Sequence, residues 1–216
     1  MEYISIKGIS NPIRHVVRIT KFGPILSDAL WSDDDPKKNG DKALALRWVA
    51  LERGDTTLES FFLLQKASNW MEFRDAIRPY VAPSQNFVFA DKEGNIGYIT
   101  TGKLIRRTDP ISGFVYSLGN DTSDATLPPD YLDFEENPSV LNPKCGYIIS
   151  ANNKVTPPSF PYYLLNEHGW DLPYRAERIE EMVVDGLDGL LSVTDIQKIQ
   201  TDVDDVTWRV MKGCLR

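Results

Sequence analysis

Residues that build metal and redox sites are scarce in this sequence. Two cysteines and two histidines occur among 216 residues, and Cys145 and Cys214 lie far apart with no histidine or second cysteine at ligand spacing. They indicate neither a zinc site nor a disulfide framework, so we expect two isolated, buried thiols. The acidic run WSDDDPKKNGDK, residues 31–42, also contains proline, glycine and lysine. It predicts a solvated surface loop, and no metal site is expected there.

Long apolar runs and basic clusters are missing as well. No stretch approaches eighteen consecutive apolar residues, so no membrane-spanning helix is expected, and the start MEYISIKGISNP has no apolar signal core. The net charge is −7 and no basic cluster exceeds pairs such as Arg106-Arg107, which excludes a nucleic-acid backbone as an expected partner. The sequence also has no glycine-rich phosphate loop, no His-Glu-x-x-His helix and no internal repeat.

What is present is a mixture of helical and strand patterns. Two capping boxes, starting at Thr56 and Asn69, each open an apolar pattern of helical spacing, and Ser192 opens another. The predicted helices are residues 55–67, 69–80, 174–186 with Gly186 as its cap, and 192–203. The predicted strands are residues 3–8, 15–20, 22–28, 86–90, 96–102 and 146–151. Residues 44–51 fit a strand or a buried helix, and 106–145 predict a surface excursion. This order indicates α+β layers.

The sequence shows none of the usual motifs that mark a catalytic nucleophile or an acid and base pair. His15 and His168 have no nucleophile motif beside them. The pairs Glu135-Glu136 and Glu180-Glu181 are adjacent in sequence, so their side chains point apart and are expected to be surface charges. Five scattered tryptophans could line a carbohydrate-binding surface, although most fit amphipathic core positions.

One stretch raises a sharper question. In GYIISANNKVTPP, residues 146–158, an apolar run ends in Asn152 and Asn153 and is closed by two prolines. Asparagine tolerates the left-handed backbone region, so the pair fits a turn. The alternative is that one side-chain amide donates a hydrogen bond to a group on which negative charge develops.

The chain resembles the penicillin acylase family of N-terminal-nucleophile hydrolases. The resemblance lies in ALRWVALERGDTTLESFFLLQKASNWMEFRDAIRPYVAPSQNFVFADKEGNIGYITTGKLIRR, in FEENPSVLNPKCGYIISANNKV and in WDLPYRAERI, and it extends from residues 17 to 203. The motifs occur in the family's order and near its spacing. The resemblance implies the αββα layers of that fold, present incompletely, with residues 1–216 as a single partial domain from inside the β-subunit.

The resemblance also implies a chemistry. Members of the family hydrolyse linear amides with an N-terminal serine, whose own α-amine acts as the base. The asparagine of the family's Ala-Asn-Asn motif, which donates to the oxyanion, falls on Asn152. The arginine that orients it falls on Arg175, while Asn153 is left to the turn. An acyl-amide substrate is implied, with no cofactor.

The same resemblance implies that the nucleophile lies outside these 216 residues. The expected partner is therefore the rest of a parent chain, namely the α-subunit and the N-terminal part of the β-subunit, and the isolated chain is expected to be inactive. Asp133 departs from the family's usual proline, and Leu164 stands near a calcium-binding aspartate of some members, so no metal site is carried over. The compartment stays open, although parent enzymes of this family are often periplasmic or secreted. A degenerate, non-catalytic binding module and a carbohydrate-binding β-rich domain remain alternatives.

Overall fold

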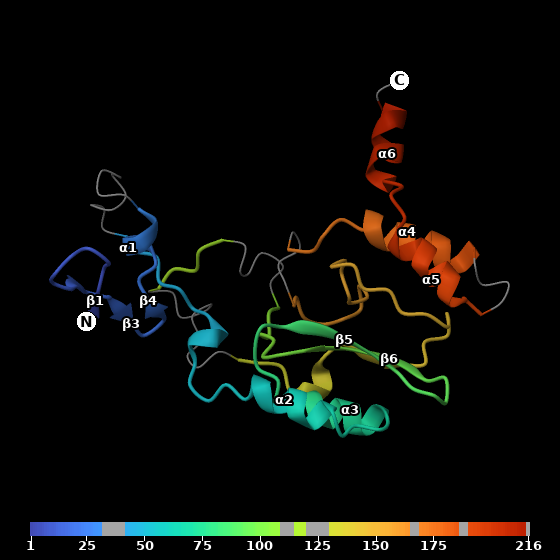
Figure 1. Cartoon of the computed structure of the whole chain (residues 1–216), viewed down its shortest axis with the longest axis horizontal. Coiled ribbons are helices and arrows are strands. Elements are labelled where there is room, and N and C mark those ends of the chain that lie inside the picture. The colour runs from blue at the N-terminus through green and yellow to red at the C-terminus, as the bar shows by residue number, and fades with distance from the viewer. Residues whose placement is uncertain (32–41, 109–114, 120–129, 165–168, 186–189, 215–216) are drawn as a thin grey trace.

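The fold is described by a computed structural model over residues 1–31, 42–108, 115–119, 130–164, 169–185 and 190–214. A small sheet with helices on both sides makes up most of the described chain, and four short strands at the N-terminus lie apart from it at one end (Figure 1). The expected α+β class is confirmed in its coarse form, since helices mix with small antiparallel sheets. Among the described elements, the largest sheet has three strands.

The central sheet is built on the predicted hairpin. Strands β5 (Gln85–Ala90) and β6 (Ile96–Thr101) pair antiparallel, and β7 (Ser139–Leu141) adds to the other edge of β6. The turn closes because the Asp91 carboxylate accepts from the backbone N–H of Asn95 at 2.8 Å. Strand β7 was not expected, because three residues without periodicity give no local strand signal.

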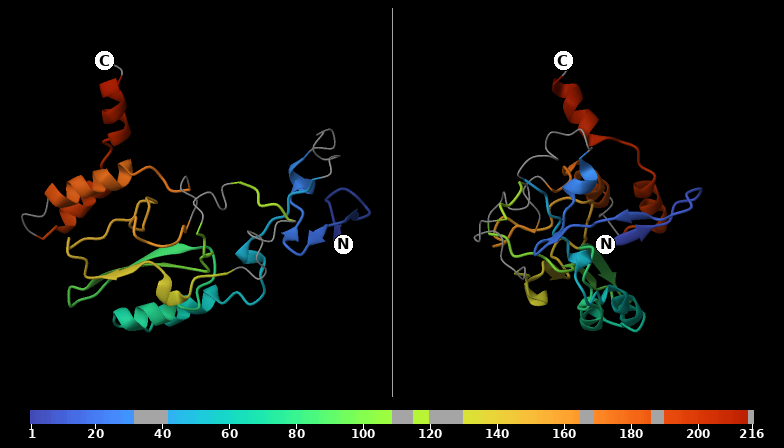
Figure 2. Two further views of the ribbon diagram at one scale, coloured as in Figure 1. Left: turned by 180° about the vertical axis from the view of Figure 1, so that it is seen from behind. Right: turned by 90° about the vertical axis from the view of Figure 1, so that its left-hand side faces the viewer.

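Helices α2 (Thr57–Leu64) and α3 (Trp70–Ile77) cover one face of this sheet, while α4 (Tyr174–Asp185) and α5 (Val193–Gln200) lie on the other side (Figure 2). Aromatic rings fill the interface between these two helices and the sheet. The ring centroid of Phe89 lies 5.6 Å from the centroid of Trp70 and 5.2 Å from the centroid of Phe73. Gly97 of β6 makes this approach possible, because a Cβ there would lie 2.5 Å from the Trp70 ring.

The helix starts agree with the sequence only in part. Of the capping box predicted at Asn69, one half forms: Asn69 accepts from the Glu72 N–H at 3.0 Å, but the Glu72 carboxylate accepts from the Ser68 N–H instead of that of Asn69. The Ser192 and Asp195 capping box of α5 forms fully. The predicted Thr56 box is wrong. Thr56 donates its hydroxyl to the Pro79 carbonyl at 2.6 Å instead, and α2 is capped by the Asp55 carboxylate, which accepts from the Thr57 N–H.

Two predicted extended segments form no strand. Residues 147–150 are unassigned to any strand, so the expected strand at 146–151 is wrong. Residues 44–51 form neither a strand nor a long helix; they contain a single bridge from Ala45 to Ile25 and a short 3₁₀ turn, Val49–Leu51. No residue of 147–150 or of 44–51 is fully buried, and the partner that a strand must pair with is not encoded locally.

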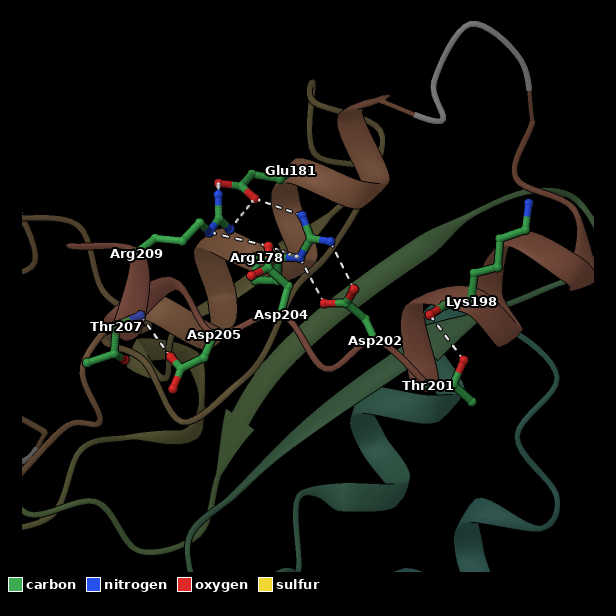
Figure 3. Close-up of polar contacts among 9 residues, drawn as sticks. All are labelled: Arg178, Glu181, Lys198, Thr201, Asp202, Asp204, Asp205, Thr207 and Arg209. Atoms are coloured by element: carbon green, nitrogen blue, oxygen red, sulfur yellow. Dashed lines mark hydrogen bonds and ion pairs between the residues drawn. The ribbon is translucent and has the colours of Figure 1, made fainter. Parts of the chain in front are cut away.

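The C-terminal helices are tied together by charge. Helix α6 (Val206–Cys214), which the sequence did not predict, follows α5 through residues 201–205. Figure 3 shows Arg178 of α4 pairing with Asp202 of this connection, while Glu181 is shared by Arg178 and Arg209 of α6. These pairs hold the connection and α6 against α4, and α6 begins beside the Asp205 carboxylate, which accepts from the Thr207 N–H at 2.8 Å. Gly186, the predicted cap of α4, lies outside the described residues.

The N-terminal region is open to solvent. Its elements are β1 (Glu2–Ile4), β2 (Ile13–His15), β3 (Ile19–Thr20), β4 (Gly23–Pro24) and α1 (Ser27–Leu30). The strand predicted at 3–8 is present as β1 but ends at Ile4, and the strand predicted at 15–20 is interrupted at residues 16–18, between β2 and β3. The extended piece predicted at 22–28 forms β4 and a bridge at Ile25, and then passes into α1. Apolar side chains in residues 1–20 are exposed, among them Tyr3, Ile9 and Ile19. Such a surface is typical of a contact face.

None of the described helices has the length and apolar character needed to cross a membrane. Most of the loop expected at 31–42 and much of the excursion expected at 106–145 lie outside the described residues, so those two predictions are only partly covered.

Candidate functional site

The Asn-Asn pair forms a tight turn between the sheet and α4. Asn152 has a φ of 62°, in the left-handed region that asparagine tolerates better than most residues. The Asn153 side chain closes the turn, because its Oδ1 accepts from the Ala151 N–H at 3.0 Å. Asn153 therefore has the structural contact expected of it, while Asn152 supplies the unusual backbone and leaves its side chain available.

Arg175 holds that side chain. It lies in the first turn of α4, and its Nη2 donates to Asn152 Oδ1 at 2.6 Å and to the Ala151 carbonyl at 2.9 Å. The two site residues singled out by the sequence are therefore in direct contact. Because the guanidinium only donates, the Asn152 oxygen must face it and the Asn152 Nδ2 must face away. Among the described residues, Nδ2 has no hydrogen-bond partner.

Asp171 completes the arrangement and was missed by sequence reasoning. Its Oδ2 accepts from Arg175 Nη2 at 2.9 Å, and its backbone N–H donates to the Asn152 carbonyl at 3.0 Å. The signal that could have found it is its spacing, four residues before Arg175 at the start of a helix, which is the spacing of an ion pair.

A cavity of about 650 Å³ opens beside the turn. Asn152 and Asp171 lie on one side of it, Asn86 and Thr100 lie on the side of the sheet, and Trp170 contributes an aromatic surface. The remaining lining residues are Ser84, Gln85, Leu104, Ser150, Leu164 and Gly169. Seven of the eleven described lining residues have polar side chains, while Leu104, Leu164 and Trp170 supply the apolar surface, so the cavity is more polar than a typical small-molecule site. Leu164, the position near the family's calcium ligand in some members, is a buried apolar residue.

The floor on the sheet side is a polar cluster. Tyr98 and Thr100 are both buried, their hydroxyl oxygens lie 2.8 Å apart, and both contact the Asn86 side-chain oxygen. Burial raises the pKa of Tyr98 to about 12. The phenol stays protonated at neutral pH, and it donates its hydrogen to the Asn86 Oδ1 at 2.7 Å.

The described lining residues include no activated nucleophile. Their hydroxyls come from Ser84, Ser150 and Thr100, and the described lining holds neither a histidine nor a lysine that could act as a base. His15 is an exposed residue of β2, and His168 lies outside the described residues. Within the described part of the chain, no three His, Cys, Asp or Glu side chains gather as a metal site would require.

The other residues named from the sequence lie elsewhere. Each adjacent glutamate pair is split between different partners, so neither forms an acid and base pair. Glu135 pairs with Arg78, whereas Glu136 pairs with Arg106, whose hydrogen bonds lower the Glu136 pKa to about 2. Glu181 pairs with Arg178 and Arg209, whereas Glu180 accepts from the Tyr147 hydroxyl at 2.6 Å, so three of the four glutamates are ion-paired more than the sequence indicated. Cys145 is exposed, which contradicts the expected buried thiol, and the Cys214 side chain lies outside the described part.

The tryptophans do not gather on one face. Trp70 packs in the core and Trp170 lines the cavity, while Trp48 and Trp208 are more than half exposed on other elements. This scatter gives no support to a carbohydrate-binding aromatic platform among the described residues.

Comparison with known proteins places these features in a family. The family model described as penicillin amidase matches residues 1–214. The acyl-homoserine lactone acylase QuiP of Pseudomonas aeruginosa PAO1 is 35% identical over 186 residues, which cover 84% of this chain and 21% of that protein. QuiP of Pseudomonas syringae pv. tomato DC3000 is 32% identical over 200 residues, covering 93% and 23%. Penicillin acylase 2 proenzyme of Pseudomonas sp. SE83 is 29% identical over 170 residues, covering 76% and 20%.

The chain spans about a fifth of the length of these relatives. All three bear the names of acylases, enzymes that cleave amides, which supports amidohydrolase function at the level of the family. The match covers nearly every residue, including the turn at Asn152 and the helix start at Arg175. The chain belongs to the penicillin amidase family.

Proposed function

We propose that these residues form part of the catalytic centre of an amidohydrolase that cleaves a linear amide through an acyl-enzyme. The observation that carries the proposal is the 2.6 Å contact between Arg175 Nη2 and Asn152 Oδ1. It turns the Asn152 Nδ2 donors away from the guanidinium, beside a cavity of about 650 Å³. A fixed amide donor next to a substrate-sized cavity is what an oxyanion hole requires.

The proposed reaction has two halves. A serine Oγ attacks the amide carbonyl carbon while its proton passes to the serine's own α-amine, and Asn152 Nδ2 donates to the oxygen that gains the negative charge. The tetrahedral species then collapses, the C–N bond breaks, and the leaving amine takes the proton. Water repeats the attack on the resulting ester and releases the acid. In this scheme Arg175 touches Asn152 and orients it, while Asp171 holds Arg175.

The serine is proposed to come from outside residues 1–216. Two observations support this. The described lining of the cavity offers hydroxyls without a base. In addition, apolar side chains of the described N-terminal strands are exposed, among them Tyr3, Ile13 and Ile19. Exposed apolar surface of this kind favours a chain that folds against a larger body.

That larger body is proposed to be the rest of an acylase, its α-subunit and the N-terminal part of its β-subunit. In this proposal residues 1–216 are one partial domain, and the αββα layers of N-terminal-nucleophile hydrolases are completed when the remaining strands join. The substrate is an acyl group linked by an amide to a small amine, the class to which acyl-homoserine lactones and penicillins belong.

The test compares the chain alone with the chain co-expressed with the missing portions of an acylase. We expect no amide cleavage by the isolated 216 residues, and cleavage by the assembled protein that falls about 10²- to 10³-fold in Asn152→Ala. Release of amine from an acyl-homoserine lactone or an acyl anilide measures both. Asn152-dependent turnover by the isolated chain would overturn the assignment of the nucleophile. Assembly with full activity in Asn152→Ala would remove Asn152 from the reaction, and assembly without turnover would favour a non-catalytic homologue.

A further inference from the structure

Asn86 connects the sheet to the turn that carries Asn152. It lies near the start of β5, on the cavity side, and its Nδ2 donates to the Ser150 Oγ at 3.2 Å. Ser150 precedes Asn152 by two residues. The contact therefore joins two segments that are 64 residues apart in the sequence.

Two hydroxyl groups of strand β6 orient the Asn86 side-chain amide. Its Oδ1 accepts from the Tyr98 hydroxyl at 2.7 Å and from the Thr100 hydroxyl at 3.0 Å. Both hydroxyl groups belong to buried side chains of β6, with 7% and 5% of their residues' surfaces exposed. The structure turns the Asn86 oxygen toward these two buried hydroxyls, which solvent cannot easily replace, and places the amide nitrogen toward Ser150.

Apart from the Asn86 contact, the described hydrogen bonds that hold this turn to other parts of the fold come from α4 and the residues just before it. Arg175 binds the Ala151 carbonyl, and the Asp171 N–H binds the Asn152 carbonyl. The Asn86 contact comes from the opposite side of the cavity. Together they hold Ser150, Ala151 and Asn152 between β5 and the start of α4, which fixes the turn in two directions.

We propose that Asn86 is a positioning residue for the oxyanion donor, acting through Ser150 on the turn that carries Asn152. This inference rests on the proposed function of Asn152. It adds a second support for that residue, built from Tyr98, Thr100 and Asn86, beside the support given by Arg175.

The first test is amide hydrogen exchange, followed by NMR in the ¹⁵N-labelled chain. The Ala151 and Asp171 amides report the turn, because they donate to Asn153 and Asn152. We expect Asn86→Ala and Ser150→Ala each to speed their exchange about five- to tenfold, the effect of losing one hydrogen bond. The double variant should be no faster than either single one, since both remove the same contact.

The matched control is Asn95→Ala. Asn95 is another hydrogen-bonded asparagine of the same hairpin, held by Asp91 and Asn142 at the far end. It should leave the Ala151 and Asp171 amides unchanged. If Asn86→Ala affects them no more than Asn95→Ala does, or if the effects of Asn86→Ala and Ser150→Ala simply add, the proposed coupling is wrong.

The second test uses the assembled acylase. A positioning role predicts that Asn86→Ala lowers kcat about tenfold and leaves KM nearly unchanged, because the donor acts on the transition state. An unchanged kcat, with the turn loosened in the exchange experiment, would refute the role in catalysis. Exchange does not need turnover, so failure of the proposed function, seen as full activity in Asn152→Ala, is distinguished from failure of the coupling.

Discussion

Arg175 donates from a single guanidinium nitrogen to the Asn152 side-chain oxygen at 2.6 Å and to the Ala151 backbone carbonyl at 2.9 Å. One atom thus fixes both the amide and the backbone just before it. Asp171 holds the same nitrogen at 2.9 Å. The arrangement sets the direction of the Asn152 Nδ2 group.

We predict that Arg175→Lys lowers kcat of the assembled acylase about tenfold or more, less than the 10²- to 10³-fold expected for losing the donor itself. A lysine ammonium keeps the charge but lacks the rigid planar fork, so it holds Asn152 less firmly. Steady-state kinetics with an acyl-amide substrate measures the effect. Arg178→Lys, one turn further along α4, is the control and should change kcat less than twofold. Equal effects of the two substitutions would contradict the role of Arg175.

A second prediction concerns the aromatic interface under the sheet. Gly97→Ala would place a Cβ 2.5 Å from the Trp70 ring, and we expect it to destabilise the folded chain by about 1–3 kcal/mol. Urea denaturation followed by circular dichroism measures this. Gly213→Ala is the matched control, because a Cβ there meets nothing within 4 Å and alanine favours a helix. A Gly97→Ala chain as stable as wild type would show that the Trp70 contact is not tight.

A third prediction follows from the ion pairs between α4 and α6. Hydrogen bonds from Arg178 lower the pKa of Asp202 below its ordinary value of 3.8, and Arg209 lowers that of Glu181 below 4.5. A carboxylate whose pKa is lower in the folded state contributes stability above its unfolded pKa and loses that contribution as the pH falls through the folded pKa. We therefore expect the α4–α6 contact to weaken below about pH 4 and not at higher pH.

Hydrogen exchange of α6 amides, corrected for the intrinsic rate and measured from pH 6 to pH 3, tests this. Protection should fall in acid. Arg178→Gln should lower it already at pH 6, whereas the exposed Arg14→Gln in β2 should not. Protection that is constant down to pH 3 would show that these pairs do not hold α6.

The sequence predicts well what depends on neighbours in the chain. The hairpin at 86–102 and the cap at Asn69 follow from turn and capping residues a few positions apart, and both are present. The strand predicted at 146–151 does not form, because a strand needs a pairing partner and an apolar run does not indicate which segment that partner is. The capping box predicted at Thr56 is wrong for a related reason, because the Thr56 hydroxyl donates to the carbonyl of Pro79, which is distant in the sequence.

The site shows the same limit. Asn152 and Arg175 were named from motifs that resemble a family, and the contact between them is a finding of the structure. Their chemical roles remain predictions. Asp171 and Asn86 were not named, because each matters only through a contact across the fold.

The most direct test of the central claim is kcat of Asn152→Asp in the assembled acylase. Aspartate tolerates the left-handed backbone and can still pair with Arg175, so the turn should persist, as the Asp171 amide exchange can verify. A carboxylate cannot donate a hydrogen bond to an oxyanion and repels it. The account predicts a loss in kcat of about 10²-fold or more with the turn intact. Wild-type kcat in that variant would contradict it.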